Sequence, residues 1–380
     1  MLLSMATWFS ATAVVPALVA RWGLGPSAAA WMTIGVQAGF VAGALGSSLV
    51  NLADVVRLDR LMAGAAAIGA AANLALLAEP SPGAAIAARI VTGVALAGVY
   101  PPAMKLMATW FRRGRGLALG ILIGALTLGS ALPHLFRALG GLDWRWVIAA
   151  SSAASLSAAA VFLLAIREGP YPFSRATMDP GQIGAVFRNR PLMLANLGYF
   201  GHMWELYAMW GWFLAFATAG PAGGRASLMT FAVVAAGVPG CVLGGLLSDR
   251  IGRTLTTAWL MAASGACALA IGFVYDGPGW AFLLVALVWG ATIVGDSAQF
   301  SASVTELADQ RYVGTALALQ LGVGFGLTIL ALWAVPLFAD WIGGWRWAFL
   351  LLVPGPVVGA AAMLALRRRP EAAALAGGRR

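Results

Sequence analysis

The stretch GGLLSDRIGRT, from Gly244 to Thr254, is a short charged segment between two long apolar ones. Gly252 lets the backbone turn sharply there, because glycine has no Cβ to restrict it. Asp249, Arg250 and Arg253 bring a carboxylate and two guanidinium groups together beside that turn. Apolar runs joined by such brief charged turns are typical of a bundle of transmembrane helices.

The composition of the whole chain agrees with this pattern. Of its 380 residues, 61% are hydrophobic and only 10% are charged, and the mean hydropathy is +0.85. An ordinary soluble domain is about half apolar and about one quarter charged. Soluble, disordered and disulfide-framework proteins are therefore excluded as classes.

Long apolar stretches recur along the entire sequence. A transmembrane helix needs roughly 20 consecutive, mostly apolar residues. Twelve stretches meet this condition, at 2–20, 27–50, 59–79, 83–108, 115–138, 145–166, 191–217, 226–248, 254–275, 279–304, 312–337 and 345–366. The predicted fold class is an all-α integral membrane protein with twelve transmembrane helices.

The positions of Lys and Arg predict the orientation in the membrane. If the N-terminus is cytoplasmic, 18 of the 24 lie on the cytoplasmic side and 5 on the other side, with Arg89 inside a span. Cytoplasmic loops carry such an excess, so we expect both termini in the cytoplasm and the chain in the cytoplasmic (inner) membrane. The formal net charge of +10 then borders anionic lipid. The lipid bilayer is thus the expected partner, nucleic acid is not, and we expect a monomer.

The two halves of the sequence repeat each other. The offset is 201 residues between Arg145 of GLDWRWV and Arg346 of GGWRWAF, 198 between GLALGILIG at 116–124 and GTALALQLG at 314–322, and 195 between Asp54 and Asp249. Such self-similarity indicates a duplication. We therefore expect a six-helix bundle over 1–166, a cytoplasmic linker over 167–190, a second bundle over 191–366 and a basic cytoplasmic tail over 367–380.

The charged turn resembles a motif of a known family. Its residues Gly245, Asp249, Arg250, Gly252 and Arg253 are similar to the G-x-x-x-D-R-x-G-R loop of the major facilitator superfamily. Asp54, Arg57 and Arg60 resemble a degenerate first copy of that loop, and Arg89 and Gly93 resemble the family's R-x-x-x-G motif. The resemblance covers essentially the whole chain. It implies two pseudo-symmetric bundles with a substrate site between them, a gating loop made of Asp249, Arg250, Gly252, Arg253, Asp54 and Arg57, and transport rather than enzyme activity.

Arg89 lies in a span that is otherwise built of small and apolar residues. A charged side chain at a helix centre costs at least about 2.5 to 3.5 kcal/mol on insertion scales, so it needs a role or a partner. One hypothesis is that Arg89 binds an anionic substrate or changes the pKa of a neighbouring carboxyl group. The alternative is a strut that is hydrogen-bonded to the carbonyl groups of other helices.

The seventh span, GYFGHMWELYAMWGW at 198–212, combines titratable and aromatic residues. His202 and Glu205 are three residues apart and share one helical face, which makes them the predicted proton-coupling site. The surrounding Tyr199, Trp204, Tyr207 and Trp210 are predicted to line the substrate cavity. The alternatives are a buried Glu/His hydrogen bond and ordinary aromatic packing.

The tenth span carries further polar residues at helical spacing. Thr292, Asp296, Gln299 and Ser303 follow an i, i+4, i+7, i+11 pattern that predicts one polar stripe facing a cavity or another polar helix. Asp296 is the second predicted proton-coupling carboxylate. Gln299, Gln320 and Gln37 are predicted to bind substrate, with interhelical hydrogen bonding as the alternative for the last two.

These features favour a proton-coupled secondary transporter of a small solute, with an organic anion considered first. The segment YPPAMKLMATWFRRGRGLALG at 100–120 resembles organic-anion and monocarboxylate importers of the superfamily, which favours uptake. A proton-driven drug or metabolite exporter is the alternative, and a non-transporting membrane sensor or membrane enzyme is a third hypothesis. No cofactor or metal is predicted, because His134 and His202 belong to different halves and the sequence has no CxxC.

Overall fold

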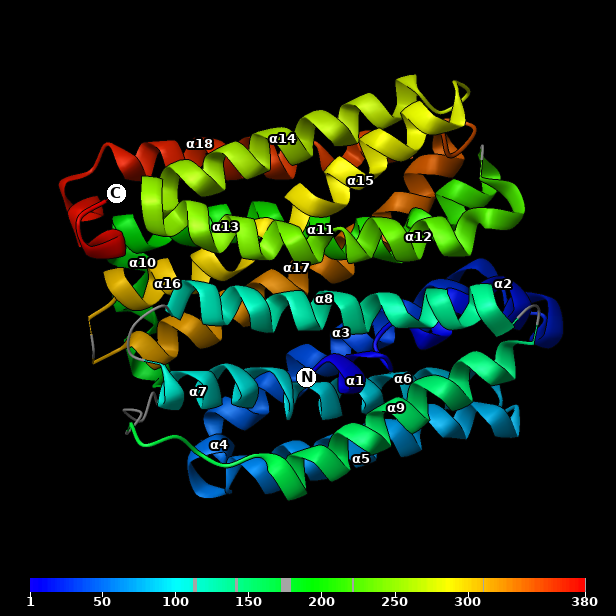
Figure 1. Cartoon of the computed structure of the whole chain (residues 1–380), viewed down its shortest axis with the longest axis horizontal. Coiled ribbons are helices and arrows are strands. Elements are labelled where there is room, and N and C mark those ends of the chain that lie inside the picture. The colour runs from blue at the N-terminus through cyan, green and yellow to red at the C-terminus, as the bar shows by residue number, and fades with distance from the viewer. Residues whose placement is uncertain (112–114, 141–142, 172–178, 221, 310, 380) are drawn as a thin grey trace.

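The fold was analysed in a computed structural model, which describes all residues except 112–114, 141–142, 172–178, 221, 310 and 380. Every element of the described chain is a helix, and the long helices run roughly along the long axis of the molecule (Figure 1). The C-terminus lies at one end of that axis, whereas the N-terminus lies near its middle. The predicted cytoplasmic arginines Arg112, Arg113, Arg175 and Arg380 fall outside the described residues.

The first half of the chain forms one group of helices. Its elements are α1 (Leu2–Met5), α2 (Ser10–Trp22), α3 (Pro26–Leu49), α4 (Leu52–Val55), α5 (Leu58–Leu74), η1 (Ala75–Ala78), α6 (Pro82–Ala97), α7 (Tyr100–Trp110), α8 (Arg115–Gly140) and α9 (Trp144–Ala165). Close contacts of α3 with α6 and of α5 with α9 hold this group together.

The second half forms the other group, preceded by two short elements of the linker. The linker contains η2 (Pro180–Gln182) and α10 (Ile183–Arg188). The second half comprises α11 (Arg190–Ala219), η3 (Gly223–Arg225), α12 (Ala226–Ala235), α13 (Gly237–Ile251), α14 (Arg253–Phe273), α15 (Gly279–Gly295), α16 (Ser297–Leu307), α17 (Val313–Trp341), η4 (Ala348–Leu352), α18 (Pro354–Arg367) and η5 (Pro370–Gly377).

All twelve predicted spans correspond to helices, and their ends agree within four residues. Eleven helical stretches of the described chain are long and apolar enough to cross a membrane. The twelfth span is α11, which is 30 residues long and carries the polar residues Asn196, His202 and Glu205. The predicted fold class is confirmed.

Several spans are broken, which the sequence analysis did not anticipate. The fourth span divides at Gly98 and Val99 between α6 and α7, and the tenth divides at Asp296 between α15 and α16. Pro101 and Pro102 follow the first break, where a missing N–H is tolerated in the first turn of a helix. The two breaks are 198 residues apart, so they occupy equivalent places in the duplicated halves.

Close packing within and between the halves depends on glycine. A Cβ on Gly93, the glycine of the R-x-x-x-G motif, would lie 2.1 Å from the carbonyl oxygen of Val36 on α3. Between the halves, α8 packs against α12 and α13, and α3 packs against α17. A Cβ on Gly120 of α8 would lie 2.8 Å from the carbonyl oxygen of Cys241 on α13. Larger side chains at these positions would force the helices apart.

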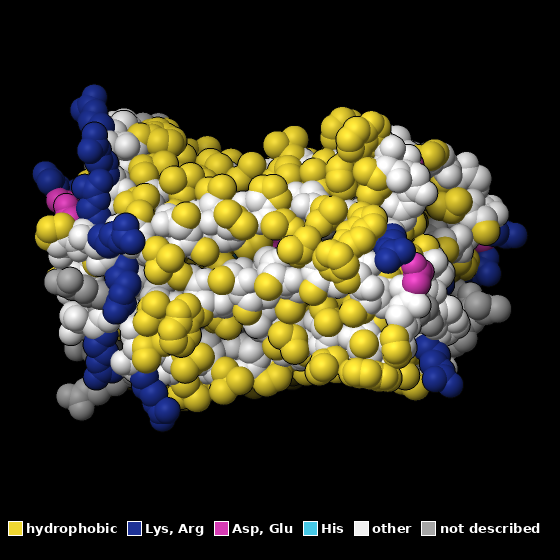
Figure 2. Space-filling view, turned by 90° about the horizontal axis from the view of Figure 1, so that it is seen from above, with side chains coloured by type: hydrophobic (Ala, Val, Ile, Leu, Met, Phe, Trp, Pro, Cys, Tyr) yellow, Lys and Arg dark blue, Asp and Glu magenta, His cyan; other side chains and the backbone are white. Residues whose placement is uncertain are grey.

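The surface has an apolar belt with charge at its two ends. Figure 2 shows hydrophobic side chains over the middle of the molecule and most of the visible Lys and Arg side chains at the end that holds the C-terminus. Large apolar side chains such as Leu164 and Trp341 are about four-fifths exposed. Such a belt is the surface that a lipid bilayer covers.

Candidate transport site

Arg89 lies on α6 and its side chain is completely buried inside the first half. Its guanidinium donates hydrogen bonds to the carbonyl oxygens of Met32 (3.1 Å), Thr7 (3.0 Å) and Trp8 (2.6 Å), to Ser10 Oγ (3.2 Å) and to Asn73 Oδ1 (2.9 Å). These five bonds use all five N–H donors of the side chain. Arg89 therefore has no donor left for an anion, and the geometry supports the strut alternative over substrate binding.

The bonds from Arg89 coincide with the break in the first span. Residues 6–9 separate α1 from α2, so the carbonyl groups of Thr7 and Trp8 lie at an interruption of the helix. A buried carbonyl group without a partner is costly inside a membrane. Arg89 donates to both of these groups, and Ser10 Oγ also donates to the carbonyl oxygen of Thr7 (3.0 Å). The break also carries Trp8 and Phe9, whose side chains contact the other half.

An aromatic cluster joins the two halves where these side chains meet. We call Trp8, Phe9, Phe40, Tyr207, Trp210 and Phe325 the interface cluster. The ring of Trp8 stacks on that of Tyr207 with centroids 5.4 Å apart, and the rings of Phe40 and Phe325 are 4.3 Å apart. All six side chains are buried, so the halves are in direct contact here and the site is closed in this structure.

Polar groups without partners accompany the interface cluster. Gln37 is completely buried on α3, and neither of its amide atoms has a hydrogen-bond partner in the described structure. Thr33, Gln37 and Phe40 are spaced i, i+4, i+7 and so lie on one face of α3. Thr33 lies against Gly211 and Phe40 against Phe325, both in the second half, so Gln37 lies on the face that meets that half. The indole N–H groups of Trp8 and Trp210 are also buried without a described partner. Buried polar groups are nearly always hydrogen-bonded, so these atoms mark a place where a ligand could bind.

Two of the predicted substrate-binding residues join this cluster and others lie elsewhere. Tyr207 and Trp210 are members, and Gln37 is on the interface stripe. Trp204 instead donates to the carbonyl oxygen of Leu351 (2.9 Å), on the side that faces α18. In this structure the indole is held within the second half, and its place in the cavity wall stays a prediction.

The predicted glutamines of the second half make contacts within that half. Gln320 donates to Asn196 Oδ1 (3.2 Å) and accepts from Ser301 Oγ (3.3 Å), which fits the interhelical alternative. Gln299 of α16 accepts from Arg253 Nη1 (2.7 Å), so it contacts the predicted gating loop. The break between α15 and α16 falls at Asp296, within the polar stripe predicted for the tenth span, so that stripe runs over two helices.

The predicted proton-coupling residues form two separate pairings. Glu205 Oε1 accepts from Ser264 Oγ (2.8 Å) and from Trp289 Nε1 (2.7 Å). His202 Nδ1 lies 2.9 Å from Asp296 Oδ1, across α11 and the break between α15 and α16. His202 and Glu205 thus lie on the same helix without a hydrogen bond between them. The contact of His202 is with Asp296 instead of Glu205.

Tyr199 connects the His202–Asp296 pair with the interface cluster. Its ring lies 6.1 Å from that of His202, in a stacked arrangement. On its other side, Tyr199 lies against Gly324, where a Cβ would be 2.2 Å from the tyrosine ring. Gly324 directly precedes Phe325 of the cluster. Tyr199 therefore packs beside the titratable pair rather than in the cluster.

The gating loop of the second half is held by Arg253. Its guanidinium forms two hydrogen bonds with Glu306 of α16, at 2.6 and 2.7 Å. The carbonyl oxygen of Asp249 accepts from Arg379, and the backbone N–H of Ala376 donates to Glu306 (3.0 Å). Within the described chain the Asp249 carboxylate has no ion pair, and among the predicted gating residues of the second half Arg253 makes the ion pair with α16.

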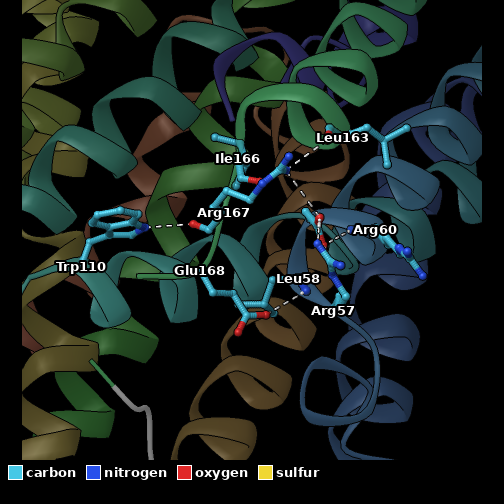
Figure 3. Close-up of polar contacts among 9 residues, drawn as sticks. Arg57, Leu58, Arg60, Trp110, Leu163, Ile166, Arg167 and Glu168 are labelled. Carbon is cyan, nitrogen blue, oxygen red and sulfur yellow. Dashed lines mark hydrogen bonds and ion pairs between the residues drawn. The ribbon is translucent and has the colours of Figure 1, made fainter. Parts of the chain in front are cut away.

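The first copy of the loop is held by different pairs. Asp54 pairs with Lys105 of α7 (2.7 Å), and Arg57 pairs with Asp59 (2.7 Å). Figure 3 shows Arg57 and Leu58 beside Arg167 and Glu168, which begin the linker. Glu168 accepts from the backbone N–H of Leu58 (3.3 Å), and Trp110 donates to the carbonyl oxygen of Arg167 (3.0 Å). The start of the linker is therefore bound to the first half.

The repeated WRW sequences have partners that sequence analysis missed. Arg145 forms an ion pair with Glu79, and Arg346 pairs with Asp276 (2.8 Å). The two acids are 197 residues apart, so the duplication offset could have identified them. Arg21 also pairs with Glu79 (3.1 Å). Hydrogen bonding from Arg21 and the charges of both arginines lower the pKa of Glu79 from its ordinary value of 4.5.

Comparisons with known proteins agree with this architecture. A family model described as Major Facilitator Superfamily matches residues 1–331. The chain belongs to this superfamily. A relative from Aspergillus terreus, named MFS-type transporter pytF, is 26% identical over 183 residues, a match that covers 44% of this chain and 58% of the relative. The chain therefore aligns with less than two thirds of that protein.

Solved structures of superfamily members have the same fold. A proton:xylose symporter, XylE, bound to 6-bromo-6-deoxy-D-glucose has a TM-score of 0.72 at 17% identity, covering 96% of this chain and 93% of its own. The Escherichia coli fucose:proton symporter FucP has a TM-score of 0.66 at 14% identity, covering 97% of this chain and 98% of its own. At these identities the likeness establishes the fold alone.

Proposed function

We propose that the chain is a secondary transporter that moves a small, neutral, polar solute by alternating access, with the solute bound at the interface cluster. The observation that carries this proposal is the Gln37 amide, which is buried at the junction of the halves without a described partner. Together with the indole N–H groups of Trp8 and Trp210, it offers three donor nitrogens and one acceptor oxygen among aromatic faces. Such a set suits a ring-shaped solute with hydroxyl or carbonyl groups.

A neutral solute fits this site better than an organic anion. The interface cluster and Gln37 contain no charged side chain, and the donors of Arg89 are all used within the first half. A buried anion without a cationic partner would be strongly disfavoured. The two solved structures of similar fold are sugar symporters, which agrees with this class by analogy only.

We further propose that protons drive this transport through Glu205 and the His202–Asp296 pair. Glu205 is bonded to two neutral donors and has no cationic partner among the described residues. A carboxyl group in such a place is held neutral or charged by small changes in its surroundings. Packing of Tyr199 between His202 and Gly324 gives a physical path from the pair to the interface cluster.

The proposal also includes the predicted topology. We propose bundles over 1–166 and 191–366, a linker over 167–190, a tail over 367–380, and the basic end of the molecule in the cytoplasm. The chain would act as a monomer in the cytoplasmic membrane. Cysteine labelling from either side of the membrane tests the orientation.

A ligand screen followed by a flux assay tests the site. Purified protein is screened by thermal shift against sugars, neutral metabolites, organic acids and cationic drugs, and each ligand found is tested for uptake into proteoliposomes. Gln37→Leu, Trp8→Phe and Trp210→Phe should each weaken binding roughly tenfold, since each removes a hydrogen bond to the solute. Gln320→Leu and Trp204→Phe are the matched controls, because their polar groups are bonded elsewhere.

Two results would contradict the proposal. Preferential binding of an organic acid would restore the anion hypothesis, and equal affinity in Gln37→Leu and the wild-type protein would move the site away from the cluster. Binding without flux in either direction would favour a sensor, and flux out of vesicles alone would favour an exporter.

A further inference from the structure

A cavity with an arginine-rich lining lies at the basic end of the second half. Its volume is about 420 Å³, and it is lined by Arg188, Asn189, Arg190, Pro191, Leu307, Arg369 and Glu371. These residues come from the junction of α10 and α11, the end of α16 and the start of η5. Figure 1 places α10, α16 and the C-terminus at the same end of the molecule.

The arginines of this cavity lack the partners that other basic residues at this end possess. Arg57, Arg253 and Arg311 form ion pairs with Asp59, Glu306 and Asp309 at 2.6 to 2.8 Å. Within the described chain, no ion pair or hydrogen bond from the side chains of Arg188, Arg190 or Arg369 is found. Three guanidinium groups and one carboxylate, that of Glu371, leave an excess of two positive charges around the cavity.

The surroundings identify the kind of anion. The 30-residue helix α11 begins at Arg190, so the positive end of its dipole adds to the arginine charges. Phe187, which directly precedes Arg188 in the sequence, is 55% exposed, and the lining itself includes the apolar residues Pro191 and Leu307. A soluble anion needs no apolar neighbours, whereas a phospholipid places its phosphate at the end of the apolar belt and its acyl chains alongside it.

We infer that the cavity lined by Arg188, Arg190 and Arg369 binds the headgroup of an anionic phospholipid. Planar guanidinium groups bind phosphate oxygens in pairs, which suits them for this headgroup. The site joins the linker helix α10 with α11, α16 and the tail, so a bound lipid would bridge the linker to the second half. This inference concerns lipid binding and does not depend on the proposed transport function.

The test measures lipid-dependent stability of the full-length protein in detergent. Phosphatidylglycerol, phosphatidylcholine and soluble glycerol phosphate are added separately, and the shift of the thermal transition is recorded. The triple variant Arg188→Gln, Arg190→Gln, Arg369→Gln is compared with the matched triple Arg60→Gln, Arg250→Gln, Arg368→Gln, which removes three exposed arginines outside the cavity. We expect phosphatidylglycerol to raise the transition temperature most, and the first triple to lose more than half of that increase while the second keeps it.

A second variant protects the test against a folding defect. Glu371→Gln removes the one acidic group of the lining, so it should increase the phosphatidylglycerol shift without disturbing the arginines. Equal shifts in both triple variants would overturn the inference, as would an unchanged shift in Glu371→Gln. Equal shifts with phosphatidylcholine would remove the charge selectivity, and an equal shift with glycerol phosphate would assign the cavity to a soluble phosphate ester instead.

Discussion

Replacement of Arg89 by methionine tests whether this residue is a strut. Trp8 would lose the donor to its buried carbonyl oxygen. The carbonyl oxygen of Thr7 would keep its hydrogen bond from Ser10 Oγ (3.0 Å), and that of Met32, inside α3, would keep its helical N–H partner. One unsatisfied buried group costs about 1 to 3 kcal/mol. Loss of the other four hydrogen bonds offsets the relief from burying a guanidinium group. We expect a net loss of about 1 to 3 kcal/mol in the free energy of unfolding.

The loss should be located at the break between α1 and α2. Hydrogen exchange read by mass spectrometry should show faster exchange in the peptide that covers residues 1–12, with little change in α14 or α18. Arg89→Lys should lie between the wild-type protein and Arg89→Met, because lysine keeps the charge but has three donors instead of five. Wild-type stability and exchange in Arg89→Met, together with loss of binding of an anion, would refute the strut and restore the substrate-binding hypothesis.

Three further predictions concern coupling, gating and pH. Glu205→Gln and Asp296→Asn should keep solute exchange between equal pools but lose accumulation driven by a pH gradient, and unchanged accumulation in both would exclude these carboxylates as the coupling site. Arg253→Gln should increase cysteine labelling at the basic end more than Asp249→Asn does, because Arg253 makes the bonds to Glu306 and Gln299; the reverse order would return the gating role to Asp249. Since folding lowers the pKa of Glu79, its ion pairs stabilise the protein above the ordinary carboxyl pKa of 4.5 and lose this effect as pH falls through the lowered value. Thermal unfolding should therefore separate wild type from Glu79→Gln at pH 7 and not at pH 2, and an equal difference at both pH values would contradict the assignment.

Hydropathy and charge predicted the helices because both depend on local composition. Twenty apolar residues in a row have few alternatives to a membrane helix, whatever they pack against. The duplication offsets likewise follow from the sequence alone. The breaks at residues 6–9 and at Asp296 could not be predicted in this way, since no proline marks them and tertiary contacts to Arg89 and His202 accompany them.

The candidate site was predicted less completely, because a helical periodicity gives a shared face but no partner. His202 and Glu205 do lie on one helix face, yet His202 lies against Asp296, and Glu205 accepts hydrogen bonds from Ser264 and Trp289 of other helices. Trp8 and Phe9 were missed because they read as ordinary apolar residues within the first span. Their importance depends on the break in that span and on the second half, and neither is visible in local sequence.

The equivalent breaks at Gly98 and Asp296 differ in chemistry. The first consists of Gly98 and Val99, followed by Tyr100 and two prolines, and it contains no carboxylate. The second contains a carboxylate that lies 2.9 Å from a histidine. The two halves are therefore equivalent in the position of this break but not in its electrostatics. A duplication that places a break at the same point of each half has left a carboxylate beside an imidazole in only one of them.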